Sequence, residues 1–163
     1  MAGKLEIMTR VLTQAQAVEW RHAHASARRR VVFTNGVFDI LHPGHVRYLA
    51  AARRQGDALI VAVNSDRSVR VIKGPSRPIH PATERAEIIT ALACVDAAVV
   101  FDEDTPWAII NAIQPDVLVK GADWPADQIV GRDIVEARGG VVVRVKVEEG
   151  HSTTRIIGKA SRP

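Results

Sequence analysis

The chain has 163 residues, of which 47% are hydrophobic, and this is enough for one domain with an ordinary core. Its net charge is +4, but only 4% of its residues are aromatic, and no basic stretch is interleaved with aromatic residues as in nucleic-acid-binding surfaces. The single cysteine, Cys94, excludes an internal disulfide framework and a cysteine-based metal site. No stretch reaches the roughly 18 apolar residues of a membrane span, and the start of the chain lacks a secretion signal. We therefore expect a cytoplasmic protein that binds neither membranes nor nucleic acid.

The predicted elements alternate between helix and strand along the chain. Residues 1–12 are expected to form a flexible arm, and Thr13 to cap a helix that ends at about Arg28. Runs of β-branched residues then predict strands at 31–34, 58–63, 97–101, 116–120 and 141–147, with helices between them at 43–55, 82–93, 105–114 and 127–138. Such alternation is typical of parallel strands joined by right-handed crossovers. The prediction is one α/β domain, residues 1–163, folded as a Rossmann-like three-layer α/β/α sandwich with a five-stranded parallel sheet.

Polar, glycine-containing segments follow several of the predicted strands. The first strand ends in Thr34-Asn35-Gly36, the second in Asn64-Ser65-Asp66, and the fourth in Lys120-Gly121. A further polar segment, 150–155, follows the last strand and begins the final helix. Because ligands bind such sheets at the carboxyl ends of the strands, these segments predict an active site along one edge of the sheet.

The segment His42-Pro43-Gly44-His45 joins the first predicted strand to the helix after it. A helix that begins there presents free backbone N–H groups and the positive end of its dipole, which together form an anion site. The two imidazoles are three residues apart and lie on one face of the first turn. The residues alone therefore indicate phosphate binding by paired histidines.

The order of a strand, a Thr-Asn-Gly turn, Asp39 and a His-x-Gly-His sequence resembles the cytidylyltransferase-like nucleotidyltransferases, and segment 33–49 carries this resemblance. Within that family, about 30–160 resembles the adenylyltransferases of ADP-heptose synthesis, in the stand-alone form that lacks a fused kinase. Segments 34–42, 62–66, 73–78 and 103–106 contribute to this closer similarity. It implies transfer of AMP from ATP, with Mg²⁺, to D-glycero-β-D-manno-heptose 1-phosphate for lipopolysaccharide synthesis. It also implies a homodimer.

Two other functions remain open. The first is a cytidylyltransferase that acts on glycerol 3-phosphate or another small phosphorylated alcohol. Relatives that use CTP commonly carry an arginine where this chain has Val147-Glu148, and this difference favours ATP. The second is a nucleotide-binding module without turnover, against which the presence of both His42 and His45 argues.

The resemblance implies a role for each position that matches the family pattern. The predicted catalytic residues are His42, His45, Lys73 and Arg85. The predicted nucleotide-binding residues are Thr34, Asn35, Gly36, Phe38, Asp39, His42, Gly44, His45, Lys120, Gly121, Asp123, Ser152, Thr153 and Thr154. The predicted acceptor-binding residues are Asn64, Asp66, Lys73 and Arg77. No side chain is predicted as a metal ligand.

Several of these residues also have a purely structural interpretation. Ser152 or Thr153 can serve only as a helix cap, and Lys120 can extend its ammonium to solvent. Segment 73–81 can be a surface loop. Asp39 either binds backbone N–H groups of a turn or orients a histidine or a hydrated Mg²⁺, and the sequence does not separate these alternatives.

Overall fold

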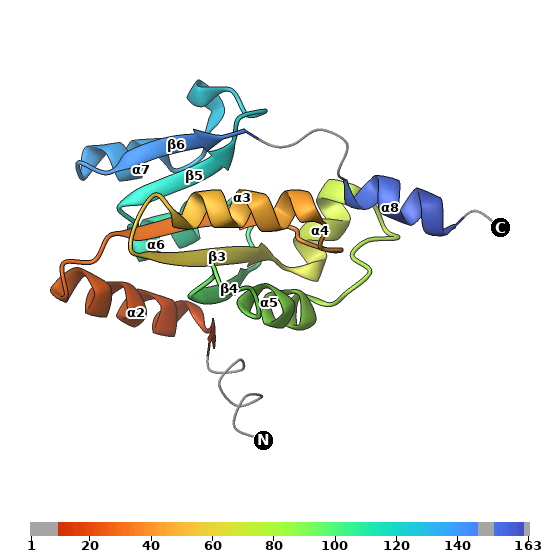
Figure 1. The fold of residues 1–163 in the computed structure, drawn as a ribbon, viewed down its shortest axis with the longest axis horizontal. Coiled ribbons are helices and arrows are strands. Elements are labelled where there is room, and N and C mark those ends of the chain that lie inside the picture. The colour runs from red at the N-terminus through yellow and green to blue at the C-terminus, as the bar shows by residue number, and fades with distance from the viewer. Residues whose placement is uncertain (1–9, 147–151, 162–163) are drawn as a thin grey trace, which may run out of the picture.

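The computed structural model describes residues 10–146 and 152–161. These residues form a parallel sheet with the strand order β1-β4-β3-β2-β5-β6 (Figure 1). The strands are β1 (Val11–Leu12), β2 (Val31–Gly36), β3 (Ala58–Asn64), β4 (Ala97–Phe101), β5 (Val117–Gly121) and β6 (Val141–Val145). The predicted α/β class with parallel strands is confirmed, and the predicted number of five strands is wrong, because the sheet has six.

The additional strand comes from the segment that we predicted as a flexible arm. Val11 and Leu12 pair with Ala98 and Val99 of β4, and the N–H of Ala98 donates to the carbonyl of Arg10 at 2.9 Å. The arm prediction is therefore wrong for residues 10–12, and residues 1–9 lie outside the described residues.

Seven α-helices and one 3₁₀ helix connect the strands within the described ranges. They are α2 (Gln14–Ser26), α3 (Pro43–Arg53), α4 (Asp66–Lys73), α5 (Ala82–Thr90), α6 (Trp107–Ile113), η1 (Ala126–Gln128), α7 (Arg132–Ala137) and α8 (Thr153–Ala160). The predicted cap Thr13 is confirmed, since its hydroxyl accepts from the N–H of Gln16. Helix α4 was not predicted, because its eight residues are mostly polar. Ser65 begins it by accepting from the N–H of Ser68.

Two apolar clusters lie on opposite faces of the sheet. Phe33 and Ile60 belong to one cluster, which also contains buried residues of α2, α6 and α7. Val32 and Val61 belong to the other, with buried residues of α3 and α5. Because neighbouring residues of one strand point to opposite faces, strands covered on both sides are apolar along their whole length. None of the helices in the described ranges has the length and apolar character that crossing a bilayer requires.

The strand order locates the ligand-binding edge. Strand β2 lies between β3 on one side and β5 on the other, and the chain leaves β2 for β3 before it returns to the opposite side. The carboxyl ends of β2 and β5 therefore lie next to each other where the strand order reverses. Ligands of open parallel sheets bind at this position.

Candidate active site

A cavity of about 690 Å³ opens at this reversal point. Its walls come from the carboxyl ends of β2 and β5, the start of α3, the end of α4 and the start of α8. Most of the predicted site residues line it: Asn35, Gly36, Phe38, Asp39, His42, Gly44, His45, Asn64, Lys73, Arg77, Lys120, Gly121, Asp123, Ser152, Thr153 and Thr154. The structure thus brings together side chains that are up to about 120 residues apart in the sequence. Three predicted residues, Thr34, Asp66 and Arg85, are not among the lining residues.

The two histidines lie against each other at the start of α3. Their rings stack with centroids 3.7 Å apart and an angle of 20° between the ring planes. His42 caps the helix, because its Nδ1 accepts from the backbone N–H of His45 at 3.3 Å. A neutral imidazole that accepts through Nδ1 carries its proton on Nε2, so Nε2 of His42 is a hydrogen-bond donor.

Burial, and to a smaller extent the neighbouring His42, lower the pKa of His45 from 6.5 to about 4. His45 is therefore neutral at pH 7. Its Nδ1 is buried and has no hydrogen-bond partner among the described residues. The ring of Phe38 meets His45 edge-on, with centroids 5.3 Å apart. The imidazole is thus fixed between two rings, and contact with an anion does not require it to be charged.

The turn before the histidines depends on Gly36. Phe38 has a φ of 47°, a left-handed conformation that side chains rarely adopt. This conformation brings the ring of Phe38 back over Gly36, where an added Cβ would lie 2.8 Å from the ring. Any residue larger than glycine at position 36 would therefore displace Phe38, and with it the ring that contacts His45.

Lys120 and Asn35 meet at the reversal point itself. The ammonium of Lys120 donates to Oδ1 of Asn35, which connects the ends of β5 and β2. Burial lowers the pKa of Lys120 from 10.5 to about 8. Within the described residues no carboxylate forms an ion pair with Lys120. This lysine is a largely buried cation that faces the cavity without a counter-ion.

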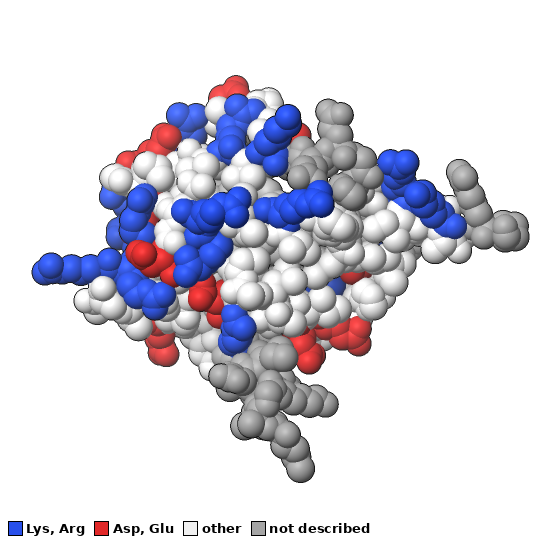
Figure 2. Space-filling model, viewed as in Figure 1, with Lys and Arg blue, Asp and Glu red and all other residues white. Residues whose placement is uncertain are grey.

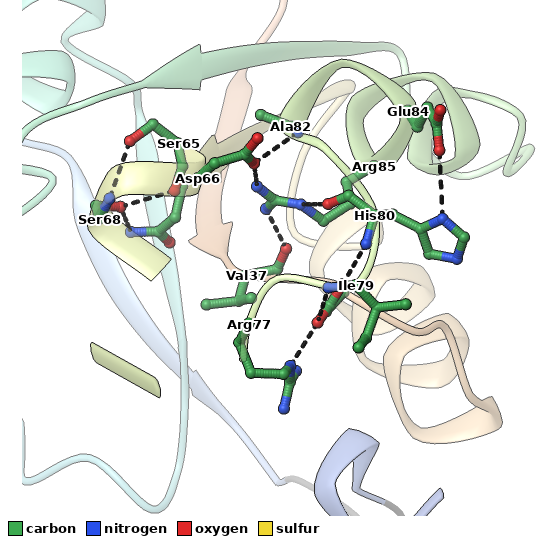
Figure 3. A network of polar contacts seen from close by, with 12 residues as sticks. Val37, Ser65, Asp66, Ser68, Arg77, Ile79, His80, Ala82, Glu84 and Arg85 are labelled. Atoms are coloured by element: carbon green, nitrogen blue, oxygen red, sulfur yellow. Dashed lines mark hydrogen bonds and ion pairs between the residues drawn. The ribbon is translucent and has the colours of Figure 1, made fainter. Parts of the chain in front are cut away.

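Asp39 is only 2% exposed. Its partners Arg77, Ile79 and His80 belong to a network of polar contacts (Figure 3). Its carboxylate accepts from the N–H of Ile79 at 2.8 Å, from the N–H of His80 at 3.0 Å and from Nε of Arg77 at 2.5 Å. Burial alone would raise the pKa of Asp39, but the hydrogen bonds from His80, Ile79 and Arg77 outweigh it and lower the pKa. Of the two alternatives for Asp39, the geometry matches the carboxylate that binds backbone N–H groups.

Arg85 is fully buried, and its guanidinium is occupied by protein acceptors. Its nitrogens donate to the carbonyl of His80 at 2.8 Å, the carbonyl of Val37 at 2.7 Å and Asp66 at 2.8 Å. Asp66 also accepts from the N–H of Ala82 at 2.8 Å. Both residues connect the start of α5 to the loop after β2. Contact of Arg85 with the triphosphate and contact of Asp66 with the acceptor stay predictions.

Thr34 lies next to the cavity but is not among its lining residues. It is fully buried, and its hydroxyl donates to the carbonyl of Val119 at 2.9 Å and lies 2.8 Å from the hydroxyl of Tyr48. Thr34 therefore links β2 to β5 beneath the cavity, and its contact with the nucleotide stays a prediction. Successive side chains of a strand point to opposite faces. Thr34 points to the face covered by α3, which carries Tyr48, whereas Asn35 lines the cavity.

Helix α8 joins the cavity through its first residues. The predicted cap is confirmed for Ser152, whose hydroxyl accepts from the N–H of Arg155 at 3.1 Å. The hydroxyl of Thr153 donates to the carbonyl of Ile40 at 3.0 Å, which ties α8 to the loop before His42. Thr154 is exposed and lines the cavity. The residues immediately before Ser152 lie outside the described residues, as does Val147-Glu148.

Several lining residues were not predicted. They are Val37, Tyr48, Ile72, Asp104, Thr105, Pro106, Trp124, Gln128, Ile129 and Val130. Asp104, Thr105 and Pro106 follow the carboxyl end of β4, so the edge rule that identified the other strand ends also points to them. Trp124 directly follows the predicted Asp123. Tyr48 gave no signal, because it reads as an ordinary apolar position of a helix.

The described residues contain no group of three or more His, Cys, Asp or Glu side chains that could hold a metal ion. The carboxylate of Asp39 is already occupied by Arg77 and two backbone N–H groups. Mg²⁺ is commonly held by substrate phosphates and water with few protein ligands. These described residues therefore fit a metal that arrives with a nucleotide.

The basic side chains do not form a single patch on the face shown in Figure 2. Lys and Arg side chains lie there in several separate groups, some beside acidic side chains. On this face the basic side chains are therefore dispersed.

The fold and the cavity together define a class of protein. A family model described as cytidylyltransferase-like matches residues 33–159, which is most of the chain and includes almost the whole cavity. The chain therefore belongs to the cytidylyltransferase-like family of nucleotidyltransferases.

More specific similarities agree with this class. The bifunctional protein HldE of Gluconobacter oxydans is 53% identical over 150 residues, which are 91% of this chain and 31% of that protein. The bifunctional protein HldE of Gluconacetobacter diazotrophicus is 50% identical over 98% of this chain and 32% of its own length. The chain thus spans about a third of these relatives. A solved lipopolysaccharide core biosynthesis protein from Thermoplasma volcanium has a TM-score of 0.61 and 30% identity, and the match covers 76% of this chain and 99% of that one.

Proposed function

We propose that this chain transfers AMP from ATP to D-glycero-β-D-manno-heptose 1-phosphate, giving ADP-heptose and pyrophosphate for lipopolysaccharide core synthesis. The observation that carries the proposal is the stacked pair of His42 and His45 on the wall of a cavity at the carboxyl edge of the sheet. Identity of 50–53% to HldE proteins supports it, as does similarity to a lipopolysaccharide core biosynthesis protein. The Rossmann-like α/β/α layering that we propose for the fold binds nucleotide phosphates at this same edge.

In the proposed reaction, an oxygen of the acceptor phosphate attacks the α-phosphorus of ATP. The bond between that phosphorus and the oxygen of the departing pyrophosphate breaks in line with the attack. This chemistry needs no protein nucleophile, because catalysis consists of positioning two phosphates and neutralising the charge that develops between them. His42, with its proton on Nε2, and the neutral His45 donate hydrogen bonds to the α-phosphate.

The remaining lining residues divide between the two substrates. Lys73 and Arg77 bind the acceptor phosphate, while the start of α8 at Ser152–Thr154 binds the β- and γ-phosphates. Lys120 brings a positive charge to the nucleotide, and Asn35 holds its ammonium in place. Mg²⁺ bound to the phosphates of ATP supplies further neutralisation of their charge.

The second candidate is a cytidylyltransferase that acts on glycerol 3-phosphate or a similar phosphorylated alcohol, which the description of the matching family favours. Pyrophosphate release distinguishes the two when each nucleoside triphosphate is paired with glycerol 3-phosphate or with either anomer of heptose 1-phosphate. We expect the highest kcat/KM for ATP with the β-anomer. A higher value for CTP with glycerol 3-phosphate would favour the second candidate. Nucleotide binding without any pyrophosphate release would contradict both and indicate a binding module.

The cellular setting follows from the proposed substrates. ATP and sugar phosphates are cytoplasmic metabolites, so we place the reaction in the cytoplasm. The single domain over residues 1–163 and the homodimer remain predictions. Limited proteolysis tests the first, and sedimentation velocity tests the second.

A further inference from the structure

Asp39 and Arg77 form an ion pair on the wall of the cavity. The side chain of Asp39 is completely buried, and that of Arg77 is 10% exposed. Arg77 donates to Asp39 through Nε alone, and its terminal nitrogens make no hydrogen bond within the described residues. Because Arg77 also lines the cavity, the pair leaves the forked end of the guanidinium available to a ligand.

The same carboxylate holds the backbone just beyond Arg77. It accepts from the N–H groups of Ile79 and His80, so one buried side chain fixes both the guanidinium and the chain that carries it. Arg85 holds this segment from the other side, through the carbonyl of His80. Residues 77–80, which we call the strap, are therefore attached to the loop after β2 by two buried charges of opposite sign.

A stabilising role alone explains this arrangement poorly. A buried ion pair contributes little net stability compared with apolar side chains of similar size, because desolvation offsets most of the attraction. What such a pair supplies is a fixed orientation. The guanidinium is planar, so its two terminal nitrogens present parallel N–H bonds that can bind two oxygens of one phosphate. A hydrogen bond at Nε fixes the direction in which these N–H bonds point.

We propose that Asp39 is a positioning residue that holds Arg77 by its Nε atom, so that the two terminal nitrogens of Arg77 bind the acceptor phosphate. The inference rests on the proposed function, in which Arg77 contacts the acceptor. It adds that Asp39 acts on acceptor binding through Arg77, and that it does not act on the nucleotide.

The test compares the KM for heptose 1-phosphate with the KM for ATP in pyrophosphate release. Asp39→Asn keeps the size of the side chain but places an NH₂ group against N–H donors, so the hold on Arg77 is lost. We expect the KM for heptose 1-phosphate to rise about tenfold, the size of one charge-assisted hydrogen bond, and the KM for ATP to change less than twofold. An equal rise in both values would overturn the inference.

A double-mutant cycle separates orientation of Arg77 from general support of the strap. If Asp39 acts through Arg77, Asp39→Asn adds less than twofold to the acceptor KM in a chain that already carries Arg77→Met. A further tenfold rise in that background would show that Asp39 acts by another route. Arg77→Lys retains the charge but loses the two parallel N–H donors, and it is expected to raise the KM for the acceptor alone. This variant is measured in place of Asp39→Asn if Asp39→Asn does not fold.

The matched control is Asp116→Asn, at the opposite edge of the sheet. Asp116 also accepts from a backbone N–H, that of Val31 at 2.7 Å, and from an arginine, Arg21 at 2.8 Å. Its loss is expected to lower thermal stability without changing either KM. A rise in the acceptor KM in this control would mean that lost stability, and not lost orientation, explains the effect at Asp39.

A second measurement does not depend on turnover. An NMR titration with inorganic phosphate is expected to shift the Nε–H signal of Arg77 in the wild type, with binding about tenfold weaker in Asp39→Asn. If heptose 1-phosphate is not a substrate, the proposed function fails, and this titration still decides the inference. Unchanged phosphate binding in Asp39→Asn would refute it.

Discussion

The amino and carboxyl ends of the parallel strands form two edges of the sheet, and the same types of charged side chain have different roles at these edges. At the amino edge, Asp116 accepts from the N–H of Val31 and from Arg21, while Asp96 accepts from the N–H of Leu59 at 2.8 Å and from Arg53 at 3.0 Å. Each carboxylate there satisfies a backbone donor near the beginning of a strand, and an arginine neutralises it. Both carboxylates therefore have an arginine partner within the protein.

At the carboxyl edge, some basic side chains have no carboxylate partner. Lys73 and Lys120 line the cavity without an ion pair in the described part of the chain, and Arg77 offers its terminal nitrogens there. Three acidic side chains, Asp39, Asp104 and Asp123, also line the cavity, and the first two of them are paired with arginines. Lysines without a carboxylate partner in a cavity favour an anionic ligand. The comparison indicates that basic residues mark a site where the fold leaves some of their N–H groups without a protein acceptor.

The largest effect on stability is expected for Arg85, an arginine near the cavity whose guanidinium is bound by protein acceptors. Arg85→Met would remove a fully buried guanidinium, which is the donor to two carbonyls and to the partly exposed Asp66. We expect a loss of about 3–5 kcal/mol in the free energy of unfolding, measured by urea denaturation. Arg132→Met, which removes an exposed pair with Glu136, should cost less than about 0.5 kcal/mol. A loss below about 1 kcal/mol for Arg85→Met would contradict the closed network.

The next effect falls on the rate and not on stability. His42→Ala removes a donor to the α-phosphate, so we expect a loss of about 3 kcal/mol of transition-state stabilisation, roughly a hundredfold in kcat. Single-turnover pyrophosphate release measures it. The loss of the helix cap should cost about 1 kcal/mol of stability. His24→Ala in α2 is the control and should retain wild-type kcat. A kcat for His42→Ala within a few-fold of wild type would remove this histidine from the mechanism.

The amino edge should respond in the opposite sense. Asp116→Asn weakens two hydrogen bonds to a buried strand start and a buried arginine, so we expect about 2 kcal/mol less stability in urea denaturation. The values of kcat and KM should stay within twofold of wild type, because Asp116 lies at the far edge from the cavity. A variant that retains full stability but loses activity would reverse the comparison.

The smallest effect is expected in the pH dependence of the activity, through Lys120. The pKa of Lys120 is lowered to about 8, so in the free protein this lysine loses its charge as the pH rises above about 8. We expect kcat/KM for ATP to fall from that point, by up to tenfold per pH unit. Lys120→Arg, whose charge persists, should shift the fall to higher pH. The sign for stability is opposite: the unfolded chain binds more protons between about 8 and 10.5, so stability rises across that interval.

Local signals in the sequence determined much of this protein. The order of strands and helices follows from short apolar runs separated by polar segments. The paired histidines, the caps at Thr13 and Ser152 and the glycine of the first turn follow from contacts within four residues along the chain. The edge rule for parallel sheets then placed most of the cavity residues together without any knowledge of their contacts.

Only the tertiary structure decided which polar residues face the cavity and which are used inside the protein. Asp39 finds its partner 38 residues away, and Arg85 reaches Val37 across 48 residues, so no local pattern separates them from ligand-binding residues. The sixth strand likewise exists because Val11–Leu12 finds the free edge of β4, 87 residues further along the chain. A polar side chain is available to a ligand only through those N–H or oxygen atoms that no neighbour in space has taken, and neighbours in space are fixed by the packing of the whole fold.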